Sequence, residues 1–270
     1  SPNILEPVVS KIEELTIYTT LFSLIISFST NLLFCVLRYG NDGKNDFMFF
    51  SKDIYKNGLM FMLTAFTMIL LTKYNILYSS IKFDSSYSGI YFSVIRISEI
   101  TTEIAVAISM VLFSRATSTK IDINAIAKTC RITFTTLFVL SMIILIILHM
   151  YLDKIPSLKN FELRHFVLAI IAALFSSLPM TLFSMLPTLI KRNSILITYL
   201  TVFTIQVFLS FIFSDLIGFD GLFISLLISN IILFLCIITL ISYQTKIKFV
   251  NFLIIKNTDF NNIFQGQKQI

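Results

Sequence analysis

The chain has no tryptophan and little charge, and both shortages narrow the class of protein to which it belongs. Only 13% of its 270 residues are charged, whereas about a quarter are charged in an average soluble protein. Hydrophobic residues make up 56% of the chain, and 28 residues are phenylalanine. This composition predicts an integral membrane protein in which tyrosine supplies the aromatic residues at the membrane interfaces.

Cysteine and histidine are also scarce, which argues against a metal site or an enzyme. The three cysteines, Cys35, Cys130 and Cys236, have neither metal-ligand spacing nor the even number that a disulfide framework needs. There are two histidines and no HExxH, GxSxG, Walker A or GxGxxG motif. We therefore expect no enzyme activity and no cofactor. The net charge of +6 is more typical of basic cytoplasmic loops than of nucleic-acid binding.

Seven continuous apolar runs are long enough to cross a hydrocarbon core of about 30 Å at about 1.5 Å per residue. The predicted spans are 15–37, 57–81, 89–114, 132–152, 165–190, 194–214 and 221–243. The runs are too long and too uniformly apolar to be the strands of a barrel. The sequence therefore predicts an all-α membrane protein with about seven transmembrane helices, of which the fifth contains Pro179 and Pro187.

The distribution of basic residues predicts the orientation of these spans. The segments after the first, third, fifth and seventh spans hold 14 Lys and Arg residues, and the segments on the opposite side hold five. This bias places the N-terminus outside and the C-terminus in the cytoplasm. We expect three parts: an outer segment with the first helix and a cytoplasmic linker (1–54), a six-helix lobe (55–245), and a cytoplasmic or interfacial tail (246–270).

Arg96, Glu99 and Glu103 share one face of the third predicted span, because residues three, four and seven apart lie on the same side of a helix. Ionisable groups at membrane depth are costly and usually functional. Lys73, in the second span, is expected at a depth similar to that of Arg96, and the two cations are candidates for binding an anionic headgroup. Two alternatives stay open: a structural pair between Arg96 and Glu99, and cations that extend to the interface.

Two further polar residues lie alone within predicted spans. Gln206 and Asn230 are typical of amides that form hydrogen bonds between transmembrane helices. His149 lies near the outer end of the fourth span and is expected to face the interface. We assign none of these three residues to the candidate site.

Several short motifs resemble those of bacterial polysaccharide flippases, in the multidrug/oligosaccharidyl-lipid/polysaccharide exporter superfamily. Gly89-Ile90-Tyr91 is similar to the family's opening of its eighth helix, and Asn75 stands where the family usually has Asp. The segments 111–115 and 128–131 also resemble the family, and 217–222 resembles the opening of its final helix.

The resemblance implies one linking helix plus the six-helix C-terminal lobe of a two-lobe transporter, in a chain that is a fragment lacking the first five helices. It implies flipping of an undecaprenyl-pyrophosphate-linked oligosaccharide across the bacterial inner membrane by alternating access, for O-antigen, capsule or exopolysaccharide synthesis. Polysaccharide polymerase and assembly proteins are the implied partners besides the lipid bilayer. The residues expected to contact substrate or tune the cavity are Lys73, Asn75, Arg96, Glu99 and Glu103.

Three other classes were weighed against a flippase. A seven-span receptor would share the outer N-terminus, but the chain lacks an Asp-Arg-Tyr end to span three, an Asn-Pro-x-x-Tyr motif in span seven and extracellular cysteines. A membrane-bound glycosyl or acyl transferase would need polar catalytic loops. A drug exporter of the same superfamily stays an alternative.

Overall fold

A computed structural model describes residues 47–118, 123–152, 162–246 and 252, and all regular structure in these residues is helical. The chain divides into two compact units, Ser1–Gly58 and Leu59–Ile270, and the site discussed below lies in the second. The three-part division expected from the sequence stays a prediction. The helices are α2 (Phe47–Lys82), α3 (Ser85–Ser118), α4 (Ile123–Tyr151), α5 (Leu163–Leu182), α6 (Leu186–Leu189), α7 (Arg192–Leu216) and α8 (Asp220–Thr245).

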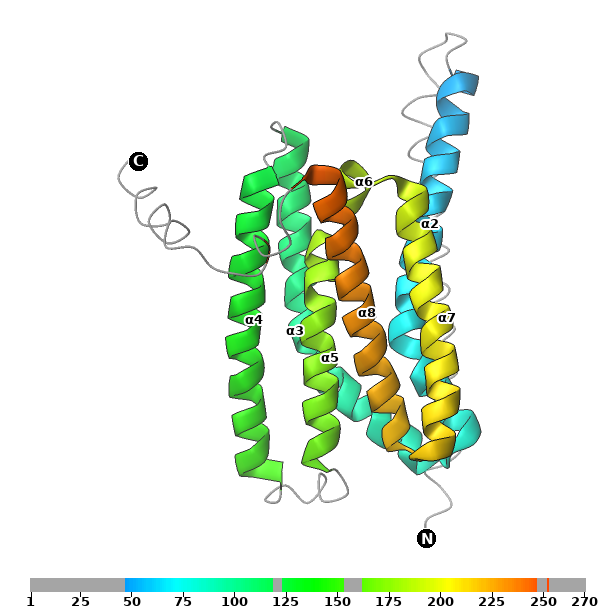
Figure 1. Ribbon diagram of the computed structural model, residues 1–270, viewed down its shortest axis with the longest axis vertical. Coiled ribbons are helices and arrows are strands. Elements are labelled where there is room, and N and C mark those ends of the chain that lie inside the picture. Colours follow the sequence, from blue (N-terminus) through cyan, green and yellow to red (C-terminus); the bar gives the residue numbers. More distant parts are fainter. Residues whose placement is uncertain (1–46, 119–122, 153–161, 247–251, 253–270) are drawn as a thin grey trace, which may run out of the picture. The chain divides into compact units, whose positions relative to one another are not determined.

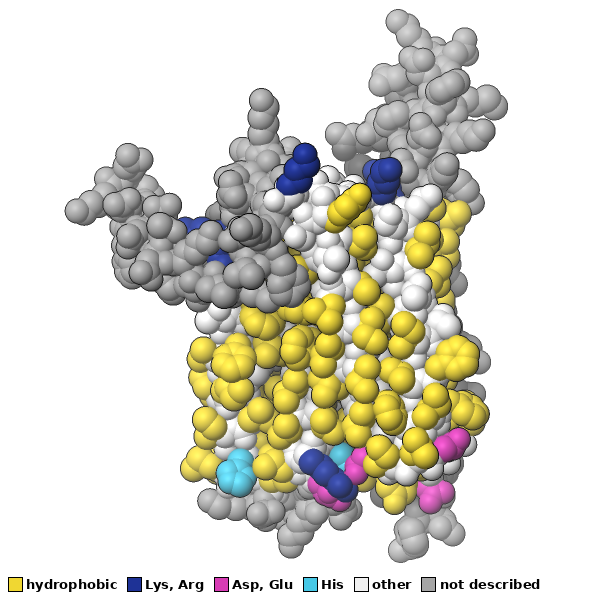
Figure 2. All heavy atoms as spheres, in the orientation of Figure 1, with side chains coloured by type: hydrophobic (Ala, Val, Ile, Leu, Met, Phe, Trp, Pro, Cys, Tyr) yellow, Lys and Arg dark blue, Asp and Glu magenta, His cyan; other side chains and the backbone are white. Residues whose placement is uncertain are grey.

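Five helical segments of the described residues are long and apolar enough to cross a membrane. They are Gly58–Lys82, Ala125–Tyr151, Leu163–Leu182, Arg192–Leu216 and Asp220–Thr245. The face shown in Figure 2 carries a broad band of hydrophobic side chains, with charged side chains gathered at its two ends. Large apolar side chains such as Ile146 and Phe208 are more than half exposed. The chain is therefore an all-α, multi-pass membrane protein whose outer surface is suited to lipid.

Helix α5 lies at the centre of the lobe and packs against α3, α4 and α8, while α7 packs against α8. Figure 1 shows α5 between α4 and α8. Its buried face is rich in small residues, including Ala169, Ala172, Ala173 and Ser177. Small side chains let neighbouring backbones approach closely, which is the main source of packing energy between helices in lipid.

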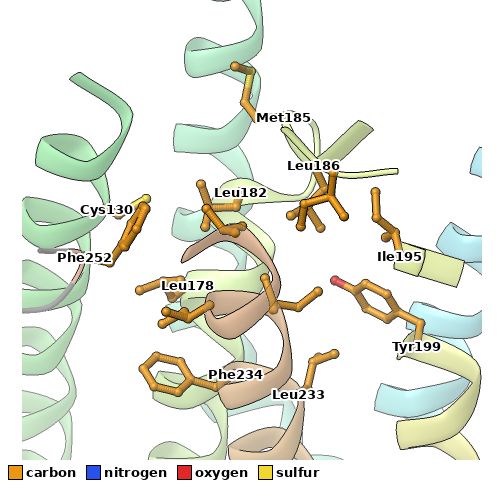
Figure 3. Packing of buried hydrophobic residues seen from close by; sticks show 14 of the residues in the cluster. Cys130, Leu178, Leu182, Met185, Leu186, Ile195, Tyr199, Leu233, Phe234 and Phe252 are labelled. Carbon is orange, nitrogen blue, oxygen red and sulfur yellow. The ribbon is translucent and has the colours of Figure 1, made fainter. Parts of the chain in front are cut away.

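The largest buried hydrophobic cluster joins α5, α7 and α8 and also contains Phe252 (Figure 3). Leu178 and Leu182 come from α5, and Leu233 and Phe234 come from α8. Phe252 is only 1% exposed, so this one described residue beyond Lys246 belongs to the core. The core therefore extends beyond the last membrane-spanning helix in sequence.

The structure corrects one of the expected spans. The run 165–190 is not one helix, because α5 ends at Leu182 and the short α6 begins at Leu186. Pro179 lies near the end of α5 and Pro187 in the first turn of α6, where its missing N–H costs little. The run 89–114 does form a helix, α3, although α3 is not among the five described segments that are apolar enough to span. The first predicted span, 15–37, lies outside the described residues.

Two helices also begin earlier than the apolar runs do. Helix α2 begins at Phe47, so the end of the cytoplasmic linker expected within 1–54 is helical. Helix α4 begins at Ile123, so Lys128 and Arg131, which were counted as loop cations, lie within it. Polar residues can continue a helix beyond the bilayer, and hydropathy does not detect that extension. The predicted orientation of the termini stays a prediction.

The turn between α7 and α8 depends on two glycines. Gly218 has φ +74°, a left-handed conformation that glycine adopts without strain. Gly221 lies against the end of α7: a Cβ atom there would be 2.7 Å from the backbone nitrogen of Ser214, and nearer still to the carbonyl of Phe213. The glycines at 218 and 221 thus allow α8 to start in direct contact with the backbone of α7.

Candidate functional site

Glu99 holds two cations, one on each carboxylate oxygen. Oε1 forms an ion pair with Lys73 of α2, and Oε2 accepts a hydrogen bond of 3.1 Å from Arg96, one turn earlier on α3. The side chain of Glu99 is 15% exposed, against 37% for Lys73 and 55% for Arg96. We name these three residues the Glu99 cluster. Its carboxylate lies inward and its cations lie toward the surface of the lobe.

The two cations lie at a similar level along their helices, because a single carboxylate contacts both. Lys73 precedes the end of α2 at Lys82, and Arg96 follows the start of α3 at Ser85. At about 1.5 Å per residue, each cation is roughly 14–16 Å from that common end of the two helices. This distance is about half the thickness of the hydrocarbon core.

Arg96 and Glu103 form an exposed polar face on the middle of α3. The Arg96 guanidinium carbon lies 5.3 Å from the centre of the Phe92 ring, which is a cation–π contact. Glu99 occupies one of its nitrogens, and a guanidinium has five N–H donors. Glu103 is exposed two turns beyond Arg96 on the same face. We name Arg96 and Glu103 the α3 face.

An exposed charge near the middle of the bilayer is costly in direct contact with lipid tails. Placing Arg or Asp at the centre of a membrane helix costs about 2.5–3.5 kcal/mol on insertion scales. The α3 face carries one cation and one anion that are exposed on the described lobe. Water or further protein therefore has to cover this face when the lobe is in a bilayer.

Asn75 lies apart from this face, inside the bundle. Its Nδ2 donates to the carbonyl of Leu222 at 3.0 Å and to Ser225 Oγ at 3.2 Å, and Ser210 donates to its Oδ1 at 2.7 Å. The residue is fully buried. Asn75 thus connects α2 with α7 and α8, and both ends of its amide are occupied by protein. The assignment of Asn75 to a substrate contact stays a prediction, and in this structure its side chain links helices.

Ion pairs fasten the helices at the end where α2 and α7 stop and α5 and α8 start. Lys82 pairs with Asp215 and donates to Ser214 at 2.7 Å, which joins α2 to α7. The carboxylate oxygens of Asp220 contact Arg164 Nη1 at 2.9 Å and His165 Nε2 at 2.6 Å, which joins α5 to α8. These pairs close one end of the described lobe.

The sequence analysis missed the pairing of His165 with Asp220. His165 is 5% exposed, and its ring stacks on Phe223 with a centroid distance of 4.8 Å. The two residues are far apart in sequence, so spacing alone does not connect them. A usable signal was present: each is a polar residue at the start of an apolar helix, and both helices start at the same end.

Comparisons with known proteins do not assign the chain to a group. No protein-family model, no curated protein and no solved structure matches it. Within the described residues, no group of three His, Cys, Asp or Glu side chains is placed to hold a metal ion. The Glu99 cluster and the α3 face are therefore the features on which a function can be argued.

Proposed function

We propose that this chain is part of a transporter that flips a lipid-linked oligosaccharide across the bacterial inner membrane by alternating access. One observation carries the proposal: the α3 face exposes Arg96 and Glu103 on the middle of a helix that packs against the apolar, membrane-spanning segments of α4 and α5. A water-filled cavity along α3 would satisfy these charges. Such a cavity is what a polar headgroup needs to cross a bilayer.

The chemistry of the Glu99 cluster suits a phosphate-bearing headgroup that binds and then leaves. Two cations and one carboxylate give the cluster a formal net charge of +1. The guanidinium of Arg96 has donors left over after Glu99, and its planar shape suits two phosphate oxygens at once. Glu99 competes for the same donors, so a phosphate would exchange with a carboxylate rather than fill an empty cationic site. That exchange keeps binding weak enough for release on the other side.

A drug exporter is the second candidate, and Glu103 is the observation that favours it. An exposed carboxylate at membrane depth could bind a cationic drug, whereas Arg96 would repel one. The two functions therefore predict different sensitive residues. An oligosaccharide flippase needs Arg96 more than Glu103, and an exporter of cations needs Glu103 more than Arg96.

The test replaces Arg96→Gln and Glu103→Gln singly in the protein as the cell expresses it, with Arg192→Gln as the matched control. Arg192 is an exposed arginine at the start of α7, away from the Glu99 cluster. We expect Arg96→Gln to reduce surface polysaccharide about tenfold, since a charge-assisted hydrogen bond contributes about 1.5–3 kcal/mol. Lipid-linked repeat units should accumulate on the cytoplasmic side, and the control should export normally. Normal export by both variants at normal protein levels would refute the proposal.

A further inference from the structure

Four residues near the start of α3 form an open patch next to Arg96. Gly89, Phe92, Ser93 and Arg96 are separated by three or four residues from one to the next, so they are neighbours on one side of the helix. Gly89 and Arg96 are exposed, and the side chain of Phe92 is 43% exposed. We name these four residues the Gly89 patch. It adjoins the Glu99 cluster through Arg96.

The packing of the lobe does not account for the glycine in this patch. Gly89 lies within a helix and outside the left-handed region, and a Cβ atom there would meet no other part of the described protein within 4 Å. Gly221, by contrast, lies directly against the backbone of α7. A glycine inside a helix lowers stability relative to alanine. The open space at Gly89 is therefore kept at a cost, and the described lobe does not use it.

Phe92 and Ser93 flank this space with two different kinds of contact. The guanidinium carbon of Arg96 lies 5.3 Å from the centre of the Phe92 ring. Lipid tails are disfavoured beside that exposed charge, so Phe92 differs from the lipid-facing apolar residues of the lobe. Ser93 donates its proton to the carbonyl of Gly89 at 2.9 Å, and its hydroxyl oxygen can still accept a hydrogen bond. The patch thus offers an aromatic ring and a polar acceptor around an open space.

We propose that the Gly89 patch binds the sugar ring that adjoins the phosphate held by Arg96. This inference rests on the proposed function and specifies its substrate as a sugar phosphate. The C–H face of a sugar ring suits the negative face of an aromatic ring, and a sugar hydroxyl can donate to Ser93. Gly89 and Arg96 are seven residues apart, or about 10 Å along the helix, which is enough for one sugar ring and the phosphate that it carries. The sugar therefore lies toward the start of α3.

The experiment measures two affinities for the protein as the cell expresses it, in lipid nanodiscs. One probe is farnesyl pyrophosphate, and the other is farnesyl pyrophosphate that carries one N-acetylglucosamine. Isothermal titration calorimetry gives the ratio of the two affinities. We expect the wild type to bind the sugar-bearing probe about three- to tenfold more tightly, as a stacking contact of this kind supplies. The ratio is independent of any change in how strongly Arg96 holds the phosphate.

Two substitutions test the patch from opposite sides. Phe92→Leu should reduce the ratio to about one, and Phe92→Tyr, which keeps the ring, should preserve it. Gly89→Leu should also reduce the ratio to about one, because its side chain fills the space, although it should unfold at or above the wild-type temperature. Gly58→Leu is the matched control: Gly58 is also an exposed helical glycine with open space around it, 15 residues before Lys73 on α2. It should keep the wild-type ratio.

The outcomes separate this inference from the function on which it rests. A wild type that binds both probes equally, or a ratio that stays at its wild-type value in both Phe92→Leu and Gly89→Leu, would overturn the sugar patch and leave the phosphate site at Arg96 standing. A wild type that binds neither probe would refute the proposed function together with the patch. If Phe92→Leu fails to fold, Gly89→Leu still decides, because its thermal unfolding reports separately on its stability.

Discussion

Gly221→Ala perturbs the close approach between the start of α8 and the end of α7. The added Cβ would lie 2.7 Å from the backbone nitrogen of Ser214 and nearer still to the carbonyl of Phe213, whereas real Cβ contacts stay beyond 3.0 Å. Backbone atoms cannot rotate away as side chains do, so α7 and α8 have to move apart. Overpacking of this kind costs about 1–3 kcal/mol, and the rigid partners place this case near the upper end. In a chain of this size, about 3 kcal/mol corresponds to roughly 6–12 °C in Tm.

Alanine substitutions at two other glycines serve as controls for the general effect of adding a methyl group. Gly89 lies within α3 with nothing within 4 Å of an added Cβ, so Gly89→Ala should raise stability by up to about 1 kcal/mol through helix propensity. Gly218 has open space but φ +74°, so Gly218→Ala should cost about 1–2 kcal/mol from backbone strain alone. The expected order of Tm is Gly89→Ala, wild type, Gly218→Ala and then Gly221→Ala.

The assay is thermal unfolding of the purified protein in detergent, followed with a dye that becomes fluorescent on reaction with thiols. Cys130 is 1% exposed in the folded chain and becomes reactive when the core opens. The same dye serves all the glycine variants, because none of them alters a cysteine. A Gly221→Ala protein that melts at or above the wild-type temperature would show that the helices separate without cost, and would refute the argument from close approach.

Two further substitutions test the ion pairs. Glu99→Gln should lower the free energy of unfolding by only about 1 kcal/mol, because Lys73 and Arg96 are partly exposed. The same variant should bind a phosphate-bearing lipid more tightly in a vesicle-binding assay, and unchanged binding would contradict the proposed competition. Asp220→Asn should lower the free energy of unfolding by about 1–3 kcal/mol, since buried His165 loses a charged acceptor. Thermal unfolding at the wild-type temperature would show that this pair does not hold α5 to α8.

The sequence predicted most of the helices because each apolar run is long and is bounded by polar residues. The limits of α7 and α8 differ from the predicted 194–214 and 221–243 by no more than two residues at either end. The predicted helix limits were wrong where a helix continues beyond its apolar run or ends inside it. Helix α4 continues into a polar segment at its start, and the run 165–190 contains a helix end at Leu182 that hydropathy alone does not reveal.

The candidate site was predictable only in part, because spacing fixes the face of a helix but not what that face meets. Offsets of three and four residues placed Arg96, Glu99 and Glu103 together, and the structure pairs the first two. The second ion pair, between Glu99 and Lys73, depends on how α2 packs beside α3. The resemblance suggested Asn75 as a substrate contact, yet its side chain is directed into α7 and α8. Interhelical facing is a property of packing, which a linear pattern does not encode.

The central position of α5 has a consequence for how the protein is made. Helix α5 packs against α8 in the finished fold. The start of α8 lies about 60 residues after the start of α5, so it is synthesised about 3–12 s later at 5–20 residues per second. During that interval the hydroxyl residues Ser176, Ser177 and Thr181, which are buried in the finished fold, lie on a helix that still lacks one of its neighbours. Each already donates its hydroxyl to a carbonyl within α5, so its proton is satisfied before the partner exists. Helix α5 can therefore lie in the bilayer against α3 and α4, with these hydroxyls satisfied, until α8 emerges from the ribosome.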